Sequence, residues 1–500
     1  MIIYVIDIGT SSMRGILFKQ DATILMKKQL THTPEYFSNG YVEQDPIILK
    51  QELISLCSSL AEYCDAHNLT PDAIVLTSQR SSVIPLKDGE PLMPAIMWQD
   101  KRTLSYKESL KHLNSVIFSK SGSTVNPVFS ACKMAWIHEN LPDIYDKCDM
   151  LSVIPEYLIY AMTGNKVLDY SYGSRSQLMN IRTNEWDSEL LDIFQIDQRK
   201  LSDLIPPASI CGTLTKDFAS LCNLKEGIPV ITAGGDQQCA ALGLGVLQDG
   251  DFEITTGTGA FILACCKQIP DDIQEDVIFS TSSIPNQYLL ESSILTCCSA
   301  FNWFKRTFYS ECEKNDFHLI NAELEHCKNT SILALPYFQG RATPDWNSNS
   351  LATFHNISLS STRGDFAHAL LEGICYEINC NIKTLKKYLK SVKHIKLCGG
   401  LTNCSIFPQL EADILQMPIS IYKNEEATAL GAFIQAMMSL GFTSNYSDAF
   451  QITRKNDFIK QYVPNPDSSE FYLKKQADFE ALYHKLYPIT KNLKESSFNL

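Results

Sequence analysis

The pattern of apolar and polar positions predicts a three-stranded meander at the amino terminus. Residues 2–6 (IIYVI) are an apolar run typical of a buried strand, and a turn of glycine, threonine and serine follows. Residues 15–30 (GILFKQDATILMKKQL) have the pattern of two more short strands. The chain is therefore expected to open a domain with a strand, a tight turn and a strand pair.

Helical spacing follows this meander. Apolar residues between Ile48 and His67 recur at the spacing of an amphipathic helix, and residues 73–77 form a second apolar strand. Residues 155–163 predict another helix, which Gly164 would end. Strands that alternate with helices in this way indicate an α/β fold.

A second round of the same pattern begins near residue 228. IPVITA predicts a strand, and Asp236–Leu247 predicts a helix rich in small residues. Residues 251–266 predict a strand, a glycine-threonine turn and a strand, which is a short echo of the turn near residue 10. The echo leaves open whether the halves arose by duplication. It does predict two domains of related design, each presenting a turn to a cleft between them.

A third glycine turn lies between residues 394 and 415. A strand ends at Cys398, and two glycines make the turn. The helix expected after them carries three apolar residues on one face: Phe407, Leu410 and Ile414.

The carboxyl-terminal part of the chain predicts two more helices. Residues 425–441 form a packed helix rich in alanine and glycine that Gly441 would end, and residues 468–485 a terminal surface helix. The last dozen residues carry no clear signal and are expected to be loose. No low-complexity linker divides the chain, so a hinge should join its parts. The expected parts are a first domain over 1–244, a second domain over 245–460 and a helical tail over 461–500.

Composition narrows the class of protein. The 500 residues are enough for two or more domains, and 45% hydrophobic with 20% charged residues is typical of a globular protein. The net charge of −13 argues against a nucleic-acid-binding surface. The 17 cysteines include no CxxC and no zinc-finger spacing, which favours reduced thiols in a cytoplasmic protein. The amino terminus lacks a basic region, and no run of 18 apolar residues predicts a membrane span.

The three glycine turns are the candidate phosphate sites. Neither GxxxxGK[ST] nor a helix-opening GxGxxG occurs, so a P-loop and a Rossmann site are not expected. A glycine turn lets backbone amides approach an anion, and hydroxyls add further donors. The first turn, DIGTSSMR, also supplies Arg14, and the helix after the third turn favours negative charge. Ordinary hairpin and strand-to-helix turns remain the alternative for each of them.

Two further features suggest chemistry. Asp236 stands between a predicted strand and a predicted helix, where it could be a helix N-cap, a general base or a carboxylate that faces magnesium. Arg80 and Trp98 lie in a polar segment after a strand and could grip the hydroxyls of a sugar or stack on its face. A core position for Trp98 is the alternative.

Taken together, these segments resemble the FGGY family of carbohydrate kinases, whose fold is that of actin, hexokinase and the Hsp70 ATPase domain. The resemblance runs in order from Asp7 to about Gly441. QR, WQDKR, FSACK and GDQQCAA look most like the glycerol kinases of that family. The segments that carry it are DIGTSSMR, GYVEQDP, QR…WQDKRT, NPVFSACK, IPEYLIYAMTG, GGDQQCAALG, TTGTGAF, STRGDFAHALLEGICYEI, CGGLTN and EEATALGAF.

The resemblance implies an α/β fold of two actin-like, ribonuclease-H-like ATPase domains with a cleft between them. It implies an ATP- and Mg2+-dependent kinase in which Asp236 is the base and Asp7 faces magnesium. Four residues would bind the acceptor, a small sugar or polyol: Arg80, Trp98, Gln237 and Phe261. Seven would contact phosphates or nucleotide: Thr10, Ser11, Arg14, Thr258, Gly259, Gly400 and Ser405. A homodimer or homotetramer, without nucleic acid or membrane partners, is expected.

Two departures concern the acceptor. Glycerol kinases carry glutamate where Ser81 stands, and tyrosine where Val128 stands before the FSACK phenylalanine. Both lost groups would bind glycerol hydroxyls, so the catalytic frame matches and the acceptor pocket does not. A xylulokinase-type ketose kinase is the alternative within the class. A non-catalytic sugar sensor or a filament-forming ATPase is the alternative outside it.

Overall fold

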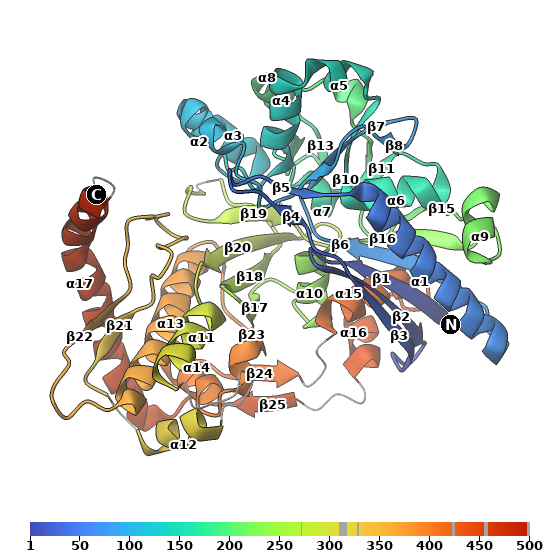
Figure 1. Ribbon diagram of the computed structural model, residues 1–500. Helices are drawn as coiled ribbons and strands as arrows, with labels where there is room; N and C mark the ends of the chain where they lie inside the picture. Colours follow the sequence, from blue (N-terminus) through green and yellow to red (C-terminus); the bar gives the residue numbers. More distant parts are fainter. Residues whose placement is uncertain (272, 310–317, 328–329, 423–425, 455–458, 498–500) are drawn as a thin grey trace. The chain divides into compact units, whose positions relative to one another are not determined.

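A computed structural model describes the chain except for residues 272, 310–317, 328–329, 423–425, 455–458 and 498–500 (Figure 1). The chain forms two compact units, and each is built from three separate segments. Unit 1 comprises Met1–Leu247, Lys267–Leu289 and Glu426–Asn456; unit 2 comprises Gln248–Cys266, Leu290–Glu425 and Asp457–Leu500. The division of the sequence into domains that end at residues 244 and 460 stays a prediction.

Unit 1 is built on a six-stranded sheet in the order β15-β16-β6-β1-β2-β3. The predicted meander is confirmed, because β1 pairs antiparallel with β2 and β2 antiparallel with β3. β6 then adds parallel to β1, and β16 adds parallel to β6. The strands are β1 (Ile2–Ile8), β2 (Ser12–Lys19), β3 (Ile24–Thr31), β6 (Ala73–Ser78), β15 (Ile210–Thr213) and β16 (Pro229–Gly235).

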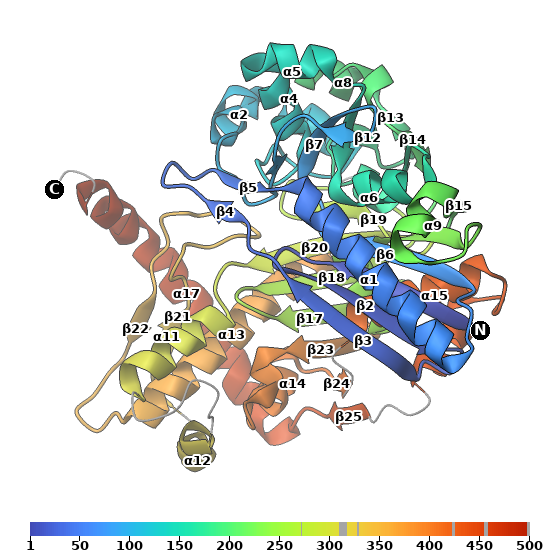
Figure 2. The same ribbon diagram turned by 45° about the vertical axis from the view of Figure 1, so that its right-hand side comes forward.

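Helices from distant parts of the chain cover this sheet. Helix α1 (Pro46–His67) lies along β2 and β3, as Figures 1 and 2 show. Helix α15 (Ala427–Ser439) contacts β1, β6 and β16, although it follows them by nearly the whole chain. It packs tightly on α10 (Asp236–Gly243), where a Cβ on Gly431 would come within 1.8 Å of the Cys239 carbonyl oxygen. The small residues predicted in these two helices therefore permit a close helix contact.

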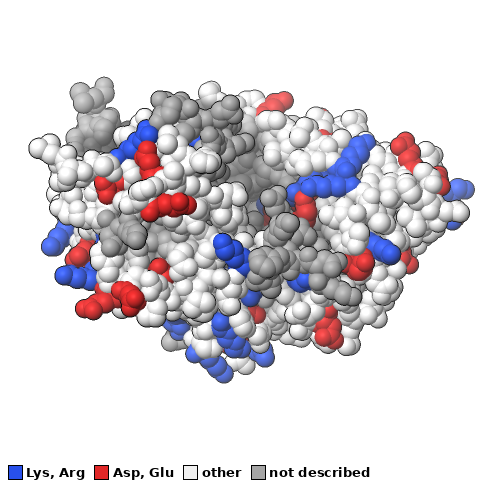
Figure 3. Space-filling view, turned by 90° about the horizontal axis from the view of Figure 1, so that it is seen from below, with Lys and Arg blue, Asp and Glu red and all other residues white. Residues whose placement is uncertain are grey.

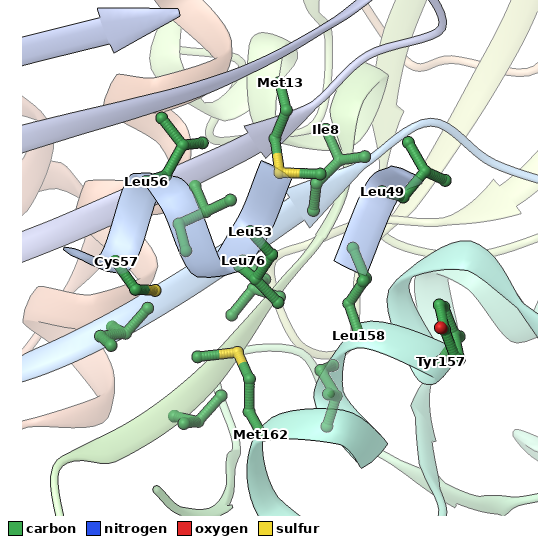
Figure 4. Packing of buried hydrophobic residues seen from close by; sticks show 14 of the residues in the cluster. Ile8, Met13, Leu49, Leu53, Leu56, Cys57, Leu76, Tyr157, Leu158 and Met162 are labelled. Atoms are coloured by element: carbon green, nitrogen blue, oxygen red, sulfur yellow. The ribbon is translucent and has the colours of Figure 1, made fainter. Parts of the chain in front are cut away.

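The main core of unit 1 lies between α1, the sheet and α6 (Ile154–Thr163). Figure 4 shows Leu53 of α1 and Leu158 and Met162 of α6 in this apolar cluster. Leu76 on β6 is also buried there. These are positions at which the periodicity predicted helix and strand, so the apolar faces meet as expected.

Unit 2 repeats the strand order of unit 1. Its strands follow the order β20-β18-β17-β23-β24-β25, which is the unit 2 part of a seven-stranded sheet. β17 pairs antiparallel with β18 and parallel with β23, and β24 adds parallel to β23. The strands are β17 (Asp251–Thr256), β18 (Ala260–Cys266), β20 (Tyr288–Ile294, from Leu290 in unit 2), β23 (His394–Gly399), β24 (Ile419–Tyr422) and β25 (Ile459–Tyr462).

The helices of unit 2 depart from the sequence prediction at one end. Helix α17 (Pro466–Ser497) is longer than expected, so the prediction of a loose last dozen residues is wrong as far as Ser497. Its described part is anchored on α13 (Arg363–Lys386) through Phe479 and Tyr376, whose rings lie 5.4 Å apart. Pro488 lies inside this helix, at a position where sequence rules expect a helix to end.

Two helix boundaries also differ. α10 ends at Gly243 rather than Leu247, because Gly245 has a positive φ of 84° that no helix continues. After the third glycine turn a short 3-10 helix, η3 (Gly400–Asn403), precedes α14 (Phe407–Leu415). Phe407, Leu410 and Ile414 are buried as predicted.

Figure 3 shows the charged residues on one face of the molecule. On the face in Figure 3 lysine, arginine, aspartate and glutamate are scattered among other residues. In the described part of the chain, no helix is both long and apolar enough to cross a bilayer. The cysteines in that part form no disulfide.

Candidate active site

A charged cluster lies at the turn between β1 and β2. Asp7 and Arg14 are opposite each other in the antiparallel pair, and an Arg14 nitrogen lies 2.5 Å from Asp7 Oδ2. The other guanidinium nitrogen is 3.4 Å from Glu426 Oε2, and Lys27 binds the second oxygen of the same carboxylate. Strand pairing and the residue before α15 thus gather two carboxylates and two cations. Sequence reasoning placed Glu426 in a family segment but gave it no role.

The Asp7 carboxyl has an unusual acidity. Burial raises its pKa to about 6, although the nearby Arg14 guanidinium lowers it. The negative charges of Asp236 and Glu426 act in the same direction as burial. A carboxylate that neighbouring acids destabilise in this way would gain from an added cation, as is common at phosphate-handling sites.

The turn itself presents two hydroxyls. Thr10 Oγ accepts a hydrogen bond of 3.0 Å from the indole Nε1 of Trp98. Ser11 is exposed at the tip. Gln79 lies behind the turn and donates to the Gly9 carbonyl at 3.2 Å. Trp98 is half-buried, so its ring is neither part of the core nor free on the surface.

Asp236 occupies the strand-to-helix turn between β16 and α10. The N-cap is Gly235, so Asp236 is the first residue of the helix and the N-cap alternative is wrong by one position. Its Oδ1 accepts a hydrogen bond of 2.8 Å from the Gln237 amide and lies 3.5 Å from Arg80 Nε. The Asp236 side chain is 27% exposed. A charged carboxylate that is positioned by a cation and still open to solvent can accept a proton.

Gly235 is required for this arrangement. A Cβ at that position would lie 2.6 Å from Arg80 Cδ and 2.6 Å from Gln238 Oε1. Arg80 crosses the turn there and donates to Gln238 Oε1 at 3.3 Å. The double glycine of the GGDQQ segment therefore admits the arginine beside the carboxylate. Gln237 is half-buried next to them.

The two positions that depart from the family pattern lie near this group in the fold of unit 1. Ser81 has a positive φ of 71°, and its hydroxyl donates to the Arg175 carbonyl at 3.3 Å. Val128 is half-buried in a loop whose carbonyls face Lys133. Lys133 Nζ donates to the carbonyls of three consecutive residues: Pro127, Val128 and Phe129, at 2.7, 2.9 and 3.2 Å. Burial lowers the pKa of Lys133 to about 7.

Part of the family pattern is structural. Arg102 binds Asp100 at 2.9 Å and Glu43 at 2.7 Å, and its guanidinium lies over the rings of Tyr41 and Trp136. The GYVEQDP and WQDKRT segments are thereby joined by a nearly buried ion cluster. This ion cluster fixes the segment that carries Trp98. Its positive and negative groups pair with one another.

Unit 2 carries its own glycine turn between β17 and β18. Thr258 is exposed, and its carbonyl accepts from the Cys297 amide at 2.9 Å and from the Ser299 hydroxyl at 2.7 Å. A Cβ on Gly259 would come within 2.2 Å of the Ile294 carbonyl oxygen, so only glycine fits. Phe261 follows on β18 and is 42% exposed.

The second glycine turn of unit 2 follows β23. Gly399 has a φ of 97°, and a Cβ there would lie 2.2 Å from the Thr256 carbonyl oxygen. Gly400 is exposed beside it. Ser405 was expected on the next helix, but it lies before α14 and its amide donates to Asn321 Oδ1 at 3.2 Å. Unit 1 therefore brings together Asp7, Thr10, Arg14, Arg80, Trp98 and Asp236, and unit 2 carries Thr258, Gly259, Phe261, Gly400 and Ser405.

Two α/β units with one strand order, each with a glycine turn after its first strand, are the arrangement of the actin-like ATPase fold class. More narrowly, the chain belongs to the FGGY family of carbohydrate kinases. The N-terminal domain of that family matches residues 2–243, and its C-terminal domain matches residues 253–440.

Similar proteins agree with this assignment. Glycerol kinase of Mycoplasmoides gallisepticum is 29% identical over 486 residues, which cover 94% of each chain. The structure of Plasmodium falciparum glycerol kinase with ADP superposes with a TM-score of 0.89 at 25% identity, over 96% of this chain and 98% of that one. Xylulose kinase from Rhodospirillum rubrum has a TM-score of 0.92 at 22% identity, over 98% of this chain and all (100%) of that one, and shows the shared fold.

Proposed function

We propose that this kinase transfers the γ-phosphoryl group of ATP to a hydroxyl of a small carbohydrate or polyol, with Asp236 as the general base. The observation that carries the proposal is the Asp236 carboxylate at the start of α10, partly exposed and 3.5 Å from Arg80. Its charge also acts on the Asp7 carboxyl of the phosphate-side turn. An in-line phosphoryl transfer needs a base and a phosphate site that lie close enough for their charges to interact.

The chemistry of the proposed step is simple. The acceptor hydroxyl loses its proton to an Asp236 oxygen as its own oxygen attacks the γ-phosphorus, and ADP leaves. Arg80 orients the carboxylate and would also bind an acceptor hydroxyl, because a guanidinium carries several N–H donors in a fixed geometry. A positioned general base accelerates such a step by typically ~10²–10⁴-fold.

The phosphate side is assigned to the first turn of each unit. In unit 1 Arg14 and the hydroxyls of Thr10 and Ser11 would contact the transferred phosphoryl group. In unit 2 Thr258 and Gly259 would lie along the nucleotide phosphates. Ser11 and Thr258 are exposed, and Thr10, Arg14 and Gly259 are partly exposed, which supports this role.

The remaining nucleotide contacts are assigned to the second turn of unit 2. Gly400 opens the short helix η3 and is exposed, which suits an approach to the α-phosphate. Ser405 is exposed as well, with its backbone amide bonded to Asn321. Its hydroxyl is the group that we assign to the nucleotide.

Magnesium fits the residues around Asp7. Mg2+ in kinases is typically held by one or two carboxylates together with phosphate oxygens and water. The Asp7 carboxylate, with a pKa raised to about 6 by burial and by nearby acids, meets that requirement in unit 1. Among the described residues no cluster of three or more protein ligands forms a cage for a metal, which suits an ion that arrives with the nucleotide. When bound, the ion would neutralise charge on the phosphates.

The acceptor site is assigned to Arg80, Trp98 and Gln237 in unit 1 and to Phe261 in unit 2. Both Trp98 and Phe261 offer a ring face to a sugar, since neither is buried. A ketose such as xylulose is the alternative acceptor. Ser81 and Val128 favour an acceptor other than glycerol, because they lack the carboxylate and the phenol of the glycerol-kinase pattern.

A panel of acceptors tests the proposal. Purified protein with ATP and Mg2+ is incubated with glycerol, short polyols, pentuloses and hexoses, and ADP release is followed. We expect ADP with one class of acceptor and a phosphorylated product by NMR. The variants Ser81→Glu and Val128→Tyr should shift preference toward glycerol. ADP release with none of them would favour a non-catalytic sensor. Assembly as a homodimer or homotetramer and a cytoplasmic location stay predictions.

A further inference from the structure

Strand β16 is irregular just before Asp236. It runs parallel to β6, and the register shifts between Thr232 and Gly234, which leaves Ala233 as an extra residue. Gly234 then has a φ of 106°. Such a bulge bends a strand and re-aims the side chains that follow it, at a cost in backbone strain. Surrounding groups must therefore hold the bulged end in place.

A buried carboxylate is linked by hydrogen bonds to residues on both sides of this bulge. One oxygen of Asp169 accepts from the Thr232 hydroxyl, which precedes the extra residue. The other oxygen accepts from the Ser171 hydroxyl at 2.5 Å, and Ser171 in turn accepts from the Gly235 amide at 2.9 Å. Asp169 is 1% exposed and Ser171 is fully buried. This chain of hydrogen bonds ends one residue before Asp236.

Two further donors fix the bulge at its centre. The Gly234 carbonyl accepts from the Tyr172 hydroxyl and from the Thr77 hydroxyl, each at 2.8 Å. A side chain at Gly234 would press on Ser171, since its Cβ would lie 3.0 Å from Ser171 Oγ. The peptide group between Gly234 and Gly235 is thus held at both its carbonyl and its amide by side chains from outside the strand.

We infer that Asp169 and Ser171 are positioning residues for Asp236, which hold the bulged end of β16 so that the carboxylate stays beside Arg80. They act through the Thr232 hydroxyl and the Gly235 amide. The inference rests on the proposed function of Asp236 as the base. A displaced base costs rate even when the substrates still bind, because a misplacement of about 1 Å can lower turnover on the order of 10²-fold.

The test compares two buried hydroxyls of one segment. Ser171→Ala removes the link to Gly235. Ser176→Ala removes a hydroxyl that bonds only to the Gly173 carbonyl and the Leu178 amide, away from β16. We expect Ser171→Ala to lower kcat on the order of 10- to 100-fold with both KM values little changed. Ser176→Ala should keep kcat, and Ser171→Thr, which retains a hydroxyl, should recover most of it.

A milder variant covers a failure of Ser171→Ala to fold. Tyr172→Phe leaves Thr77 on the Gly234 carbonyl, and we expect a smaller fall in kcat without a change in KM. The inference is overturned if Ser171→Ala and Ser176→Ala lower kcat equally, or if the loss of kcat follows the loss of melting temperature. It is also overturned if Tyr172→Phe, used where Ser171→Ala does not fold, leaves kcat unchanged. Near-normal turnover by Asp236→Asn would instead defeat the proposed base, so the two failures are distinguishable.

Discussion

The first hairpins of the two units share a scaffold and differ in chemistry. In unit 1 the residues that face each other across the hairpin are Asp7 and Arg14. In unit 2 the corresponding pair is Thr255, the last residue but one of β17, and Phe261, the second residue of β18. One hairpin thus carries a partly buried ion pair and the other an exposed aromatic ring. The same hairpin backbone therefore carries charged side chains in unit 1 and an exposed apolar ring in unit 2.

The strand beside each hairpin differs in the same way. β6 pairs with β1 and ends at Ser78, which is followed by Gln79 and the site residue Arg80. β23 pairs with β17 at the same point and ends at Gly399, where a side chain would strike the neighbouring backbone. Unit 1 uses the position after the strand for side chains, and unit 2 uses it for bare backbone. We interpret this as acceptor and phosphoryl chemistry in unit 1 and nucleotide phosphate binding in unit 2.

Among the tests of this comparison between the two hairpins, the largest expected effect concerns Arg14. Arg14→Ala removes a cation from the phosphate-side turn, and we expect kcat to fall by about 10²-fold, as for the loss of one donor to a developing charge. KM for the acceptor should change little, because Arg80 and Trp98 remain. Steady-state kinetics with the acceptor varied check this. A raised acceptor KM with normal kcat would reverse the roles given to the two hairpins.

The next effect is on stability and concerns Gly399. Gly399→Ala combines a positive φ with a contact of 2.2 Å to the Thr256 carbonyl, so we expect a loss of about 2 kcal/mol or more. Gly441→Ala is the matched control, because Gly441 has a similar φ of 71° and open space around it. Urea unfolding followed by tryptophan fluorescence measures both. Equal losses would mean that the close approach to β17 is unimportant.

A smaller effect is expected at Phe261. Phe261→Ala removes the exposed ring that we assign to the acceptor. We expect the KM for the acceptor to rise about ten-fold, which corresponds to ~1.4 kcal/mol of lost binding free energy. The KM for ATP should stay the same. Phe471→Ala on α17 removes a ring of similar exposure, 39%, and serves as the control. An unchanged acceptor KM in the Phe261 variant would separate unit 2 from acceptor binding.

The smallest effect is a shift of the acid limb of activity. Asp7 must be ionised to face a cation, so activity should fall as the pH falls through about 6, the raised pKa of Asp7. Glu426 contributes to that rise, and Glu426→Gln should therefore lower the pKa of Asp7 and extend activity to lower pH. We expect a shift of about half a pH unit in a profile of kcat/KM for ATP. A shift of the acid limb toward higher pH would contradict the effect that we assign to Glu426 on the pKa of Asp7.

Sequence reasoning found the scaffold because its signals are local. The meander after residue 2, the helix that begins near Ile48 and the glycine turns follow from periodicity and turn chemistry, and the structure bears them out. The echo near residue 257 was enough to suggest related units, and the shared strand order now supports that relation. The length of α17 was underestimated because the helix continues past Pro488, and a proline normally indicates that a helix has ended.

The supporting shell of the site could not be predicted in the same way. Asp169 is 67 residues before Asp236 in the sequence, and nothing local says that its carboxylate meets β16. Its only local signal is the serine two residues later, which fits an ordinary helix cap, and Asp169 does cap α7 (Tyr170–Gly173). Glu426 is likewise joined to Arg14 only by the packing of α15 on the sheet. Contacts across such separations are set by the tertiary fold.

The measurement that tests the central claim most directly is turnover by Asp236→Asn beside ATP binding by the same protein. Asp143→Asn is the control, because Asp143 is an exposed acidic residue in the first turn of another helix, α5 (Pro142–Lys147). We predict that Asp236→Asn loses ~10²–10⁴-fold in acceptor phosphorylation while its affinity for ATP is retained, and that Asp143→Asn behaves like the parent. Near-normal phosphorylation by Asp236→Asn would contradict the assignment of Asp236 as the base.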